Sequence, residues 1–288
     1  MFTEKTEKNK IRKRWSHSWI SAVFVVLLAS FCYSAYKLAD ALIVAKNERD
    51  AFKELSEIVA NNQNLILIKE DDTAKNEDNS FEDFPVLSSE SPSERLPLQQ
   101  YVPLFEMNPD FFGWLSVEGT MMDFPVMYSP ERPEYYLNHA FDGSSSSSGV
   151  PFVDGRCSAD GNYYLIYGHH MRNKSMFGQL PKYADPSFYE EHPIIIFDTL
   201  YEQRKYQIVA AFYSRVYDKN ETGVFRYYEY YDLSDNEVFE EYIEKVKTEA
   251  IYDTGIEVTY GDELLVLSTC NYHASNGRFV VVAKRISP

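Results

Sequence analysis

The sequence predicts a mainly β domain with added helices, held at a membrane by an N-terminal helix and a helical stalk. The chain of 288 residues opens with a basic segment and an uncharged apolar segment, and it then becomes polar and acidic. From about Tyr101 it shows short apolar runs separated by turn-forming residues, which is typical of strands. With 23 Tyr and 19 Phe, the chain has ample material for strands and for a core.

Charge is distributed unevenly along the chain. Residues 1–18 hold six of the 28 basic side chains and two of the 44 acidic ones, so the remainder carries a net charge of −20. A body this acidic repels phosphate, so we expect no nucleic-acid partner.

The segment from residue 19 to residue 36 contains no charged residue and is just long enough to cross a bilayer as a helix. Because basic flanks stay in the cytoplasm, residues 1–18 are expected to be a cytoplasmic tail, with everything after about residue 37 outside the cell. A cleaved signal peptide is the alternative. It is disfavoured by the length of the apolar core and by the lack of a clear A-x-A cleavage site.

The segment after the anchor is expected to be a helical stalk over residues 37–60. Phe52, Leu55, Ile58 and Val59 form one apolar stripe at helical spacing. A free amphipathic helix on the membrane surface is the alternative interpretation. Residues 61–100 are polar and acidic and include three prolines, which is the composition of a linker.

Residues 101–288 are expected to form the globular domain, as a closed or nearly closed β structure of seven or eight strands. The expected strands lie at 112–117, 124–128, 163–167, 194–197, 206–212, 263–268 and 279–283. Two helices are expected between them, one near 134–138 and one over 236–250. Ser234 or Asp235 can cap the second helix.

Cys270 is the candidate nucleophile. It follows the apolar run Leu264–Leu267, so its thiol is expected to emerge at the edge of the sheet. A cation nearby would lower the pKa of such a thiol and make it reactive. Taken alone, a buried structural cysteine is the more common interpretation.

Arg278 supplies a candidate cation. The residues between Cys270 and Arg278 include several turn formers, so their two strands can form a hairpin. We expect the pair near the open end of that hairpin, on neighbouring strands ~4.8 Å apart. The guanidinium could then stabilise an oxyanion on the carbon that the sulfur attacks.

His169 is the candidate acid or base, because Gly168 breaks the strand before it and presents the ring on a loop. His170 is expected to face another way. Structural roles are expected for His139, His192 and His273. The adjacent histidines lack the spacing of helical zinc ligands, and no C-x-x-C motif occurs, so we expect neither a metal site nor a cofactor.

Several motifs resemble those of class B sortases. Residues 167–173 (Tyr-Gly-His-His-Met-Arg-Asn) and 175–178 are similar to the histidine motif of that family. Residues 267–270 (Leu-Ser-Thr-Cys) and 277–281 are similar to its cysteine and arginine motifs. Residues 108–114, 123–126 and 136–143 resemble the start of its catalytic domain. The resemblance covers roughly residues 101–286.

The resemblance implies a mixed eight-stranded β-barrel with extra helices and a cysteine transpeptidase of the Gram-positive cell surface. In such an enzyme Cys270 attacks a threonine carbonyl in a sorting signal near the C-terminus of a secreted protein. His169 would protonate the leaving amine, and Arg278 would hold the substrate and the oxyanion. An amine of a cell-wall precursor or a pilin lysine then resolves the thioacyl intermediate.

The resemblance also implies a peptide groove lined by Tyr167, Ser268, Thr269 and Leu137. Pro133 stands where the family often has an asparagine, and the helix from Asn236 resembles the class B insertion that borders the groove. Two other kinds of function are weighed beside the transpeptidase. One is a surface cysteine peptidase that only hydrolyses, and the other is a binding module on a stalk without catalytic activity.

Overall fold

The computed structural model describes residues 2–74, 95–271 and 273–286. The chain divides into two units, residues 1–51 and residues 52–288. Helix α1 (Phe2–Ala74) runs through the first unit and into the second. By length and composition, its part from Trp19 to Asn64 contains a stretch that could cross a membrane, with a mean hydropathy of 1.8.

Helix α1 continues beyond residue 60, where a polar linker was expected to begin. Residues 61–74 contain neither proline nor glycine, so nothing in them breaks a helix, although their composition is polar. Residues 75–94 of the expected linker lie outside the described part of the chain. Its last residues lie against the domain, since Leu98 donates its N–H to the carbonyl of Leu200 at 2.7 Å and Gln100 is buried.

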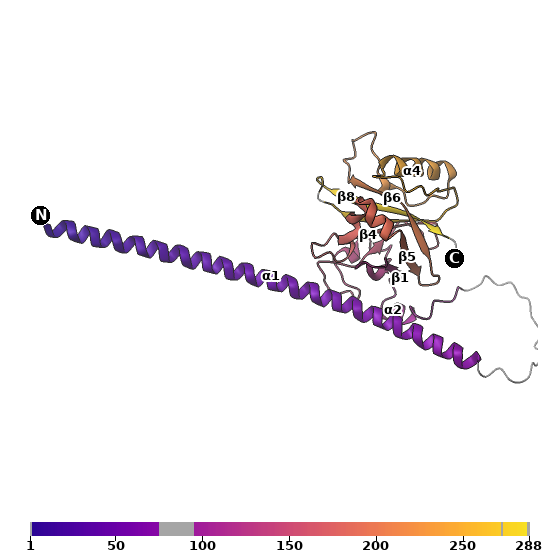
Figure 1. Cartoon of the computed structure of the whole chain (residues 1–288), viewed down its shortest axis with the longest axis horizontal. Coiled ribbons are helices and arrows are strands. Elements are labelled where there is room, and N and C mark those ends of the chain that lie inside the picture. The colour runs from indigo at the N-terminus through magenta and orange to yellow at the C-terminus, as the bar shows by residue number, and fades with distance from the viewer. Residues whose placement is uncertain (1, 75–94, 272, 287–288) are drawn as a thin grey trace, which may run out of the picture. The chain divides into compact units, whose positions relative to one another are not determined.

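The second unit contains a closed, mixed barrel of eight strands, as expected (Figure 1). Its strands are β1 (Phe111–Ser116), β2 (Asp123–Met127), β3 (Phe152–Val153), β4 (Tyr163–Gly168), β5 (Ile194–Thr199), β6 (Lys205–Arg215), β7 (Leu264–Cys270) and β8 (Gly277–Ile286). Their order around the barrel is β1-β2-β3-β4-β7-β8-β6-β5, and β5 pairs with β1 to close it. The pairs β2/β3 and β4/β7 are parallel, and the others are antiparallel.

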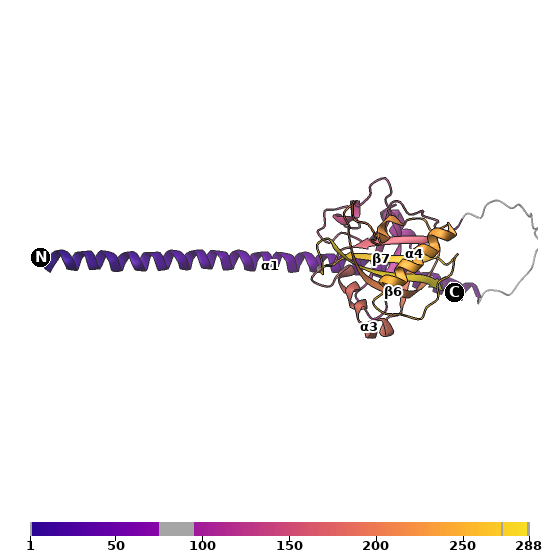
Figure 2. The same ribbon diagram turned by 90° about the horizontal axis from the view of Figure 1, so that it is seen from above.

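Seven of these strands match the apolar runs of the sequence, and β3 was not predicted. With two residues, β3 is too short to show periodicity. The helices are α2 (Val102–Met107), α3 (Pro186–Glu191) and α4 (Asn236–Glu249), with the 3-10 helices η1 (Tyr135–Leu137), η2 (Phe177–Ala184) and η3 (Tyr227–Glu229). The two predicted helices correspond to η1 and α4. Helix α4 lies against β6 and buries Phe239, Tyr242 and Val246 (Figure 2).

The apolar stripe predicted for the stalk contributes to the hydrophobic core of the second unit. Leu55 is buried in a cluster with Leu104, Phe111 and Trp114. The Phe52 ring lies 6.4 Å from the ring of Phe124, centroid to centroid. The C-terminal part of α1 therefore packs on the barrel through the face that its helical spacing made apolar.

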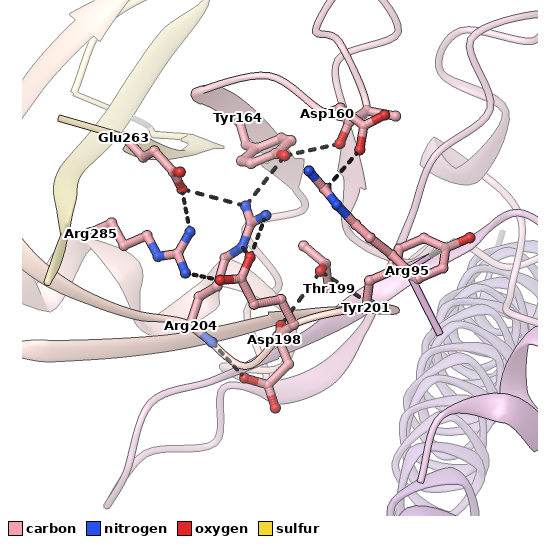
Figure 3. A network of polar contacts seen from close by, with 11 residues as sticks. Arg95, Asp160, Tyr164, Asp198, Thr199, Tyr201, Arg204, Glu263 and Arg285 are labelled. Carbon is pink, nitrogen blue, oxygen red and sulfur yellow. Dashed lines mark hydrogen bonds and ion pairs between the residues drawn. The ribbon is translucent and has the colours of Figure 1, made fainter. Parts of the chain in front are cut away.

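A network of ion pairs holds one end of the barrel (Figure 3). Arg204, after the β5–β6 turn, is buried and bonds Glu202 through Nε at 3.0 Å. Its Nη1 lies 3.7 Å from a carboxylate oxygen of Glu263, just before β7, and 3.3 Å from the Tyr164 hydroxyl. Arg285, near the end of β8, donates to both Glu202 and Glu263. The network therefore joins four strands at one end of the barrel, where β4, β6 and β7 begin and β8 ends.

Asp235 caps helix α4, since its Oδ1 accepts from the backbone N–H groups of Glu237 and Val238 at 2.9 and 3.0 Å. We predict that Asp235→Ala lowers the free energy of unfolding by about 1 kcal/mol, because these N–H groups lose their partner. Asp235→Asn should retain most of the wild-type free energy of unfolding, because an asparagine can also cap the helix. Ser234→Ala leaves the cap in place and should lower the free energy of unfolding less than Asp235→Ala does. Chemical denaturation measures all three. An equal loss for Ser234→Ala and Asp235→Ala would contradict the assignment.

Candidate active site

Three adjacent strands bring the candidate residues together. Strand β7 pairs with β8 in antiparallel register, with Cys270 opposite Arg278. Strand β4 pairs with β7 in parallel register, with Tyr167 beside Ser268 and Gly168 beside Thr269. His169 follows directly after β4. The Cys270–Arg278 pair lies next to the loop that closes the hairpin, and not at its open end as the sequence suggested.

Cys270 is the last residue of β7 and the only exposed residue of that strand. Six buried residues precede it, so the strand is anchored in the core while its final side chain reaches solvent. Cys157, in contrast, is buried, and burial raises the pKa of its thiol to about 12. All three cysteines of the chain lie in its described part and are free thiols.

His169 is half-buried, and its Nε2 lies 2.8 Å from the backbone carbonyl oxygen of Leu137. The break in the strand before it depends on Gly168. A side chain at Gly168 would come within 2.7 Å of the Phe177 ring, which is itself fully buried. Only glycine allows the chain to pass this ring and present the histidine.

Arg278 is half-buried at the start of β8. Its Nη1 donates to the backbone carbonyls of Asn276 and Gly277 at 3.3 and 3.1 Å. The loop before it is tight, since a Cβ atom on Gly277 would lie 2.2 Å from the carbonyl oxygen of Asn271. These hydrogen bonds restrain the Arg278 guanidinium on the strand next to the thiol.

The three candidate residues line one cavity of about 490 Å³, a size that suits a peptide segment. The candidate groove residues Leu137, Tyr167, Ser268 and Thr269 line it as well. A thiol, an imidazole and a guanidinium on one open groove can carry out nucleophilic acyl transfer. Among the described residues, no group of three or more His, Cys, Asp or Glu side chains could hold a metal ion.

The side chains of the groove residues have different partners. Ser268 and Tyr227 share a hydrogen bond of 2.7 Å between their hydroxyl groups. The Thr269 hydroxyl donates to the carbonyl of Gly168 at 2.7 Å, so this side chain joins the ends of β4 and β7. The Tyr167 hydroxyl donates to Asp154 at 3.2 Å.

Asp154 and Arg156 form an ion pair in the groove that the sequence reasoning missed. Arg156 donates from Nε and Nη2 to the two carboxylate oxygens of Asp154, at 2.9 and 2.6 Å. Burial acts to raise the pKa of Asp154, but the hydrogen bonds from Arg156 outweigh it and hold that pKa below its ordinary value. The only signal in the sequence was the Asp-Gly-Arg spacing directly after β3.

Tyr227 and Tyr228 were also missed, although both line the groove. They belong to η3, inside the long segment between β6 and β7. Burial raises the pKa of Tyr227, while its hydrogen bond with Ser268 acts in the opposite direction. The Tyr228 carbonyl accepts from Arg156 Nη2 at 2.7 Å. In the sequence these residues stand in a tyrosine-rich stretch with no helical or strand periodicity.

His170 lies outside the set of residues that line the groove, yet it contacts the backbone of Cys270. Its Nδ1 lies 2.8 Å from the carbonyl oxygen of Cys270. Two side chains thus join the ends of β4 and β7: Thr269 at the last paired position, and His170 from the segment after β4.

Comparison with known proteins agrees with this geometry. The family model of the sortase domain matches residues 115–286. A sortase B of Listeria monocytogenes is 30% identical over 188 residues, which cover 64% of this chain and 73% of the relative. A solved structure of a Staphylococcus aureus sortase B–substrate complex covers 85% of this chain and 99% of its own, with 25% identity and a TM-score of 0.66.

A structure of sortase B complexed with triglycine covers 84% of this chain and 99% of its own, with 25% identity and a TM-score of 0.65. The family-model match begins inside β1 and runs through β8, so it includes β7 with its thiol, β8 with its guanidinium, and the residue after β4 that bears the imidazole. This chain therefore belongs to the sortase family of cysteine transpeptidases, and its relatives place it in class B.

Proposed function

We propose that this protein cleaves a C-terminal sorting signal of secreted proteins and transfers the acyl group to an amine. The acceptor is an amine of a peptidoglycan precursor or a pilin lysine. The observation that carries the proposal is the meeting of Cys270, His169 and Arg278 on one open groove. The substrate and triglycine complexes of related sortases support a peptide donor and an amine acceptor.

The proposed reaction begins with attack of the Cys270 thiolate on the carbonyl carbon of a threonine. A carbon–sulfur bond forms, and Arg278 stabilises the negative charge on the carbonyl oxygen. The carbon–nitrogen bond then breaks, and His169 gives a proton to the leaving amine. The resulting thioester is attacked by the acceptor amine, which returns a proton to His169 as the carbon–sulfur bond breaks.

The groove residues would hold the peptide during these steps. Tyr167, Ser268 and Thr269 lie on β4 and β7 beside the reacting groups, and Leu137 lines the same groove from η1. Positioning of this kind decides whether an amine or water reaches the thioester. The groove residues therefore set the ratio of amide product to hydrolysed product.

We also propose the arrangement of the chain at the cell surface. Residues 1–18 would lie in the cytoplasm, 19–36 would cross the membrane once, and 37–60 would form the stalk. Residues 61–100 would connect the stalk to the catalytic domain at 101–288, outside the cell. The basic flank and the apolar stretch within α1 support this orientation.

The transferase and a purely hydrolytic peptidase differ in their products. We expect labelled peptides that vary around a central threonine to give an amide product when triglycine is added, and to give mainly hydrolysis without it. Mass spectrometry of the products distinguishes the two. Hydrolysis alone at every triglycine concentration would favour the peptidase, and no turnover of any peptide would contradict both.

Cys270 should be alkylated by iodoacetamide at neutral pH before Cys157, because the Cys157 thiol is buried and its pKa is raised to about 12. We expect loss of activity to follow modification of Cys270 alone, measured by peptide mapping of the Cys32→Ser chain in detergent. Cys157→Ala should keep its activity, and Cys270→Ala should have none. Full activity of a chain alkylated at Cys270 would remove it as the nucleophile.

Arg278→Ala should lower kcat/KM by about 10²–10³-fold, the range for loss of one oxyanion donor. Arg278→Lys should recover only part of this loss, because a lysine cannot present a planar fork of donors. Steady-state kinetics with a fixed peptide measures both variants. The midpoint of thermal unfolding of each variant serves as the control. A fall in activity that is matched by a fall in this midpoint would indicate a structural role for Arg278.

A further inference from the structure

We propose that the backbone carbonyl of Leu137, held in place by Gly149, fixes the His169 ring so that Nε2 permanently carries a proton. The catalytic proton is then carried on Nδ1. This inference rests on the proposed role of His169 as the acid. It assigns Leu137 a positioning role through its main chain, in addition to its side chain on the groove wall.

The hydrogen bond itself determines which nitrogen holds the permanent proton. The carbonyl oxygen of Leu137 can only accept, so the 2.8 Å contact requires an N–H at Nε2 of His169. In the neutral ring the lone pair therefore lies on Nδ1. Within the described residues, Nδ1 of His169 has no hydrogen-bond partner, so it is the nitrogen able to take up and release a proton.

The backbone of Gly149 packs closely against the Leu137 carbonyl and restrains it. Gly149 is buried and has a φ of 57°, and a Cβ atom there would lie 2.6 Å from the Leu137 oxygen and 2.3 Å from the Tyr136 oxygen. The next residue, Val150, donates its N–H to the Tyr136 carbonyl at 3.0 Å. Backbone packs directly on backbone here, which leaves the Leu137 carbonyl little freedom to turn away from the histidine.

His170 provides an internal comparison, because its ring makes the opposite hydrogen bond. Its Nδ1 lies 2.8 Å from the carbonyl oxygen of Cys270, so this nitrogen must carry the proton. Two adjacent histidines are thus held in opposite tautomers by two carbonyls, one in η1 and one at the end of β7.

The proton balance of the reaction follows from this assignment. The proton of the Cys270 thiol moves to Nδ1 of His169 and gives a thiolate and an imidazolium whose Nε2–H stays bonded to Leu137. When the carbon–nitrogen bond of the substrate breaks, the Nδ1 proton passes to the leaving nitrogen. The ring returns to the neutral form with the proton on Nε2, so it never needs to rotate.

The direct test is a long-range ¹H–¹⁵N spectrum of the full chain in detergent micelles, with ¹⁵N-labelled histidine, at a pH where the rings are neutral. For His169 we expect a pyridine-like shift at Nδ1 and a pyrrole-like shift at Nε2, and for His170 the reverse. Single His169→Gln and His170→Gln variants assign the signals. An Nδ1–H tautomer at His169, or an averaged mixture of the two, would overturn the inference.

A matched pair of glycine variants tests the role of the packing. Gly149→Ala should shift the His169 signals toward those of an averaged mixture of the two tautomers. It should also lower kcat by about 10²-fold, because a small misplacement of a reacting group has an effect of this size, and it should change KM less. Gly143→Ala carries a similar backbone strain, since its φ is 79°, but the nearest atom to its Cβ would be the Tyr135 hydroxyl at 3.5 Å. It should keep the wild-type spectrum and activity.

The outcomes separate this inference from the proposed function. An active enzyme with the Nδ1–H tautomer would refute the inference and leave the transpeptidase standing. The Nε2–H tautomer together with a fully active His169→Ala chain would refute the catalytic role instead. Where Gly149→Ala does not fold, the wild-type spectrum alone decides. Equal effects of the two alanine variants on spectrum and kcat would also count against the inference.

Discussion

The site depends on the register in which β7 pairs with its two neighbours. The antiparallel pairing with β8 places Arg278 opposite Cys270, and the parallel pairing with β4 brings the segment after Gly168 alongside. In a strand, a slip of one residue turns every side chain to the other face. A slip of β7 would therefore take Cys270 out of register with Arg278 and with the segment after Gly168, so the pairing that closes the barrel also places the thiol beside these residues.

Polar contacts reinforce this register at both ends of the strands. Near the site, Thr269 and His170 each bond a backbone carbonyl on the neighbouring segment, at the last paired position and just beyond it. At the other end, Arg204 and Arg285 share the carboxylates of Glu202 and Glu263 (Figure 3). Such partly exposed ion pairs contribute little to the free energy of unfolding individually. Their geometry nonetheless ties the start of β7 to the end of β8 and to the β5–β6 turn.

The barrel and the positions of the three candidate catalytic residues could be predicted from the sequence because those residues lie on strands or directly after one. Seven strands are recognisable as apolar runs, and Cys270, His169 and Arg278 stand at strand ends where position follows from chain direction. The rest of the groove wall, beyond Leu137, Tyr167, Ser268 and Thr269, could not be predicted in this way. Asp154 and Arg156 follow a strand of two residues, and Tyr227 and Tyr228 lie in a long connection whose path depends on tertiary contacts.

The polar composition of residues 61–74 predicted a linker, but α1 continues through them to Ala74. Helix ends depend on breaking residues more than on mean hydropathy. Similarly, only the structure reveals that the main chain of Gly149 packs on Leu137, because a single glycine with a positive φ produces no recognisable pattern in the sequence.

The connection between β6 and β7 is attached to the groove at two points, through Tyr227 to Ser268 and through the Tyr228 carbonyl to Arg156. Neither attachment involves the thiol or the imidazole. The thiol and the guanidinium are thus carried by strands of the barrel, whereas Tyr227 and Tyr228 bring part of the groove wall from a connection outside it. A substitution in this connection would therefore reshape that part of the wall without replacing the thiol, the imidazole or the guanidinium.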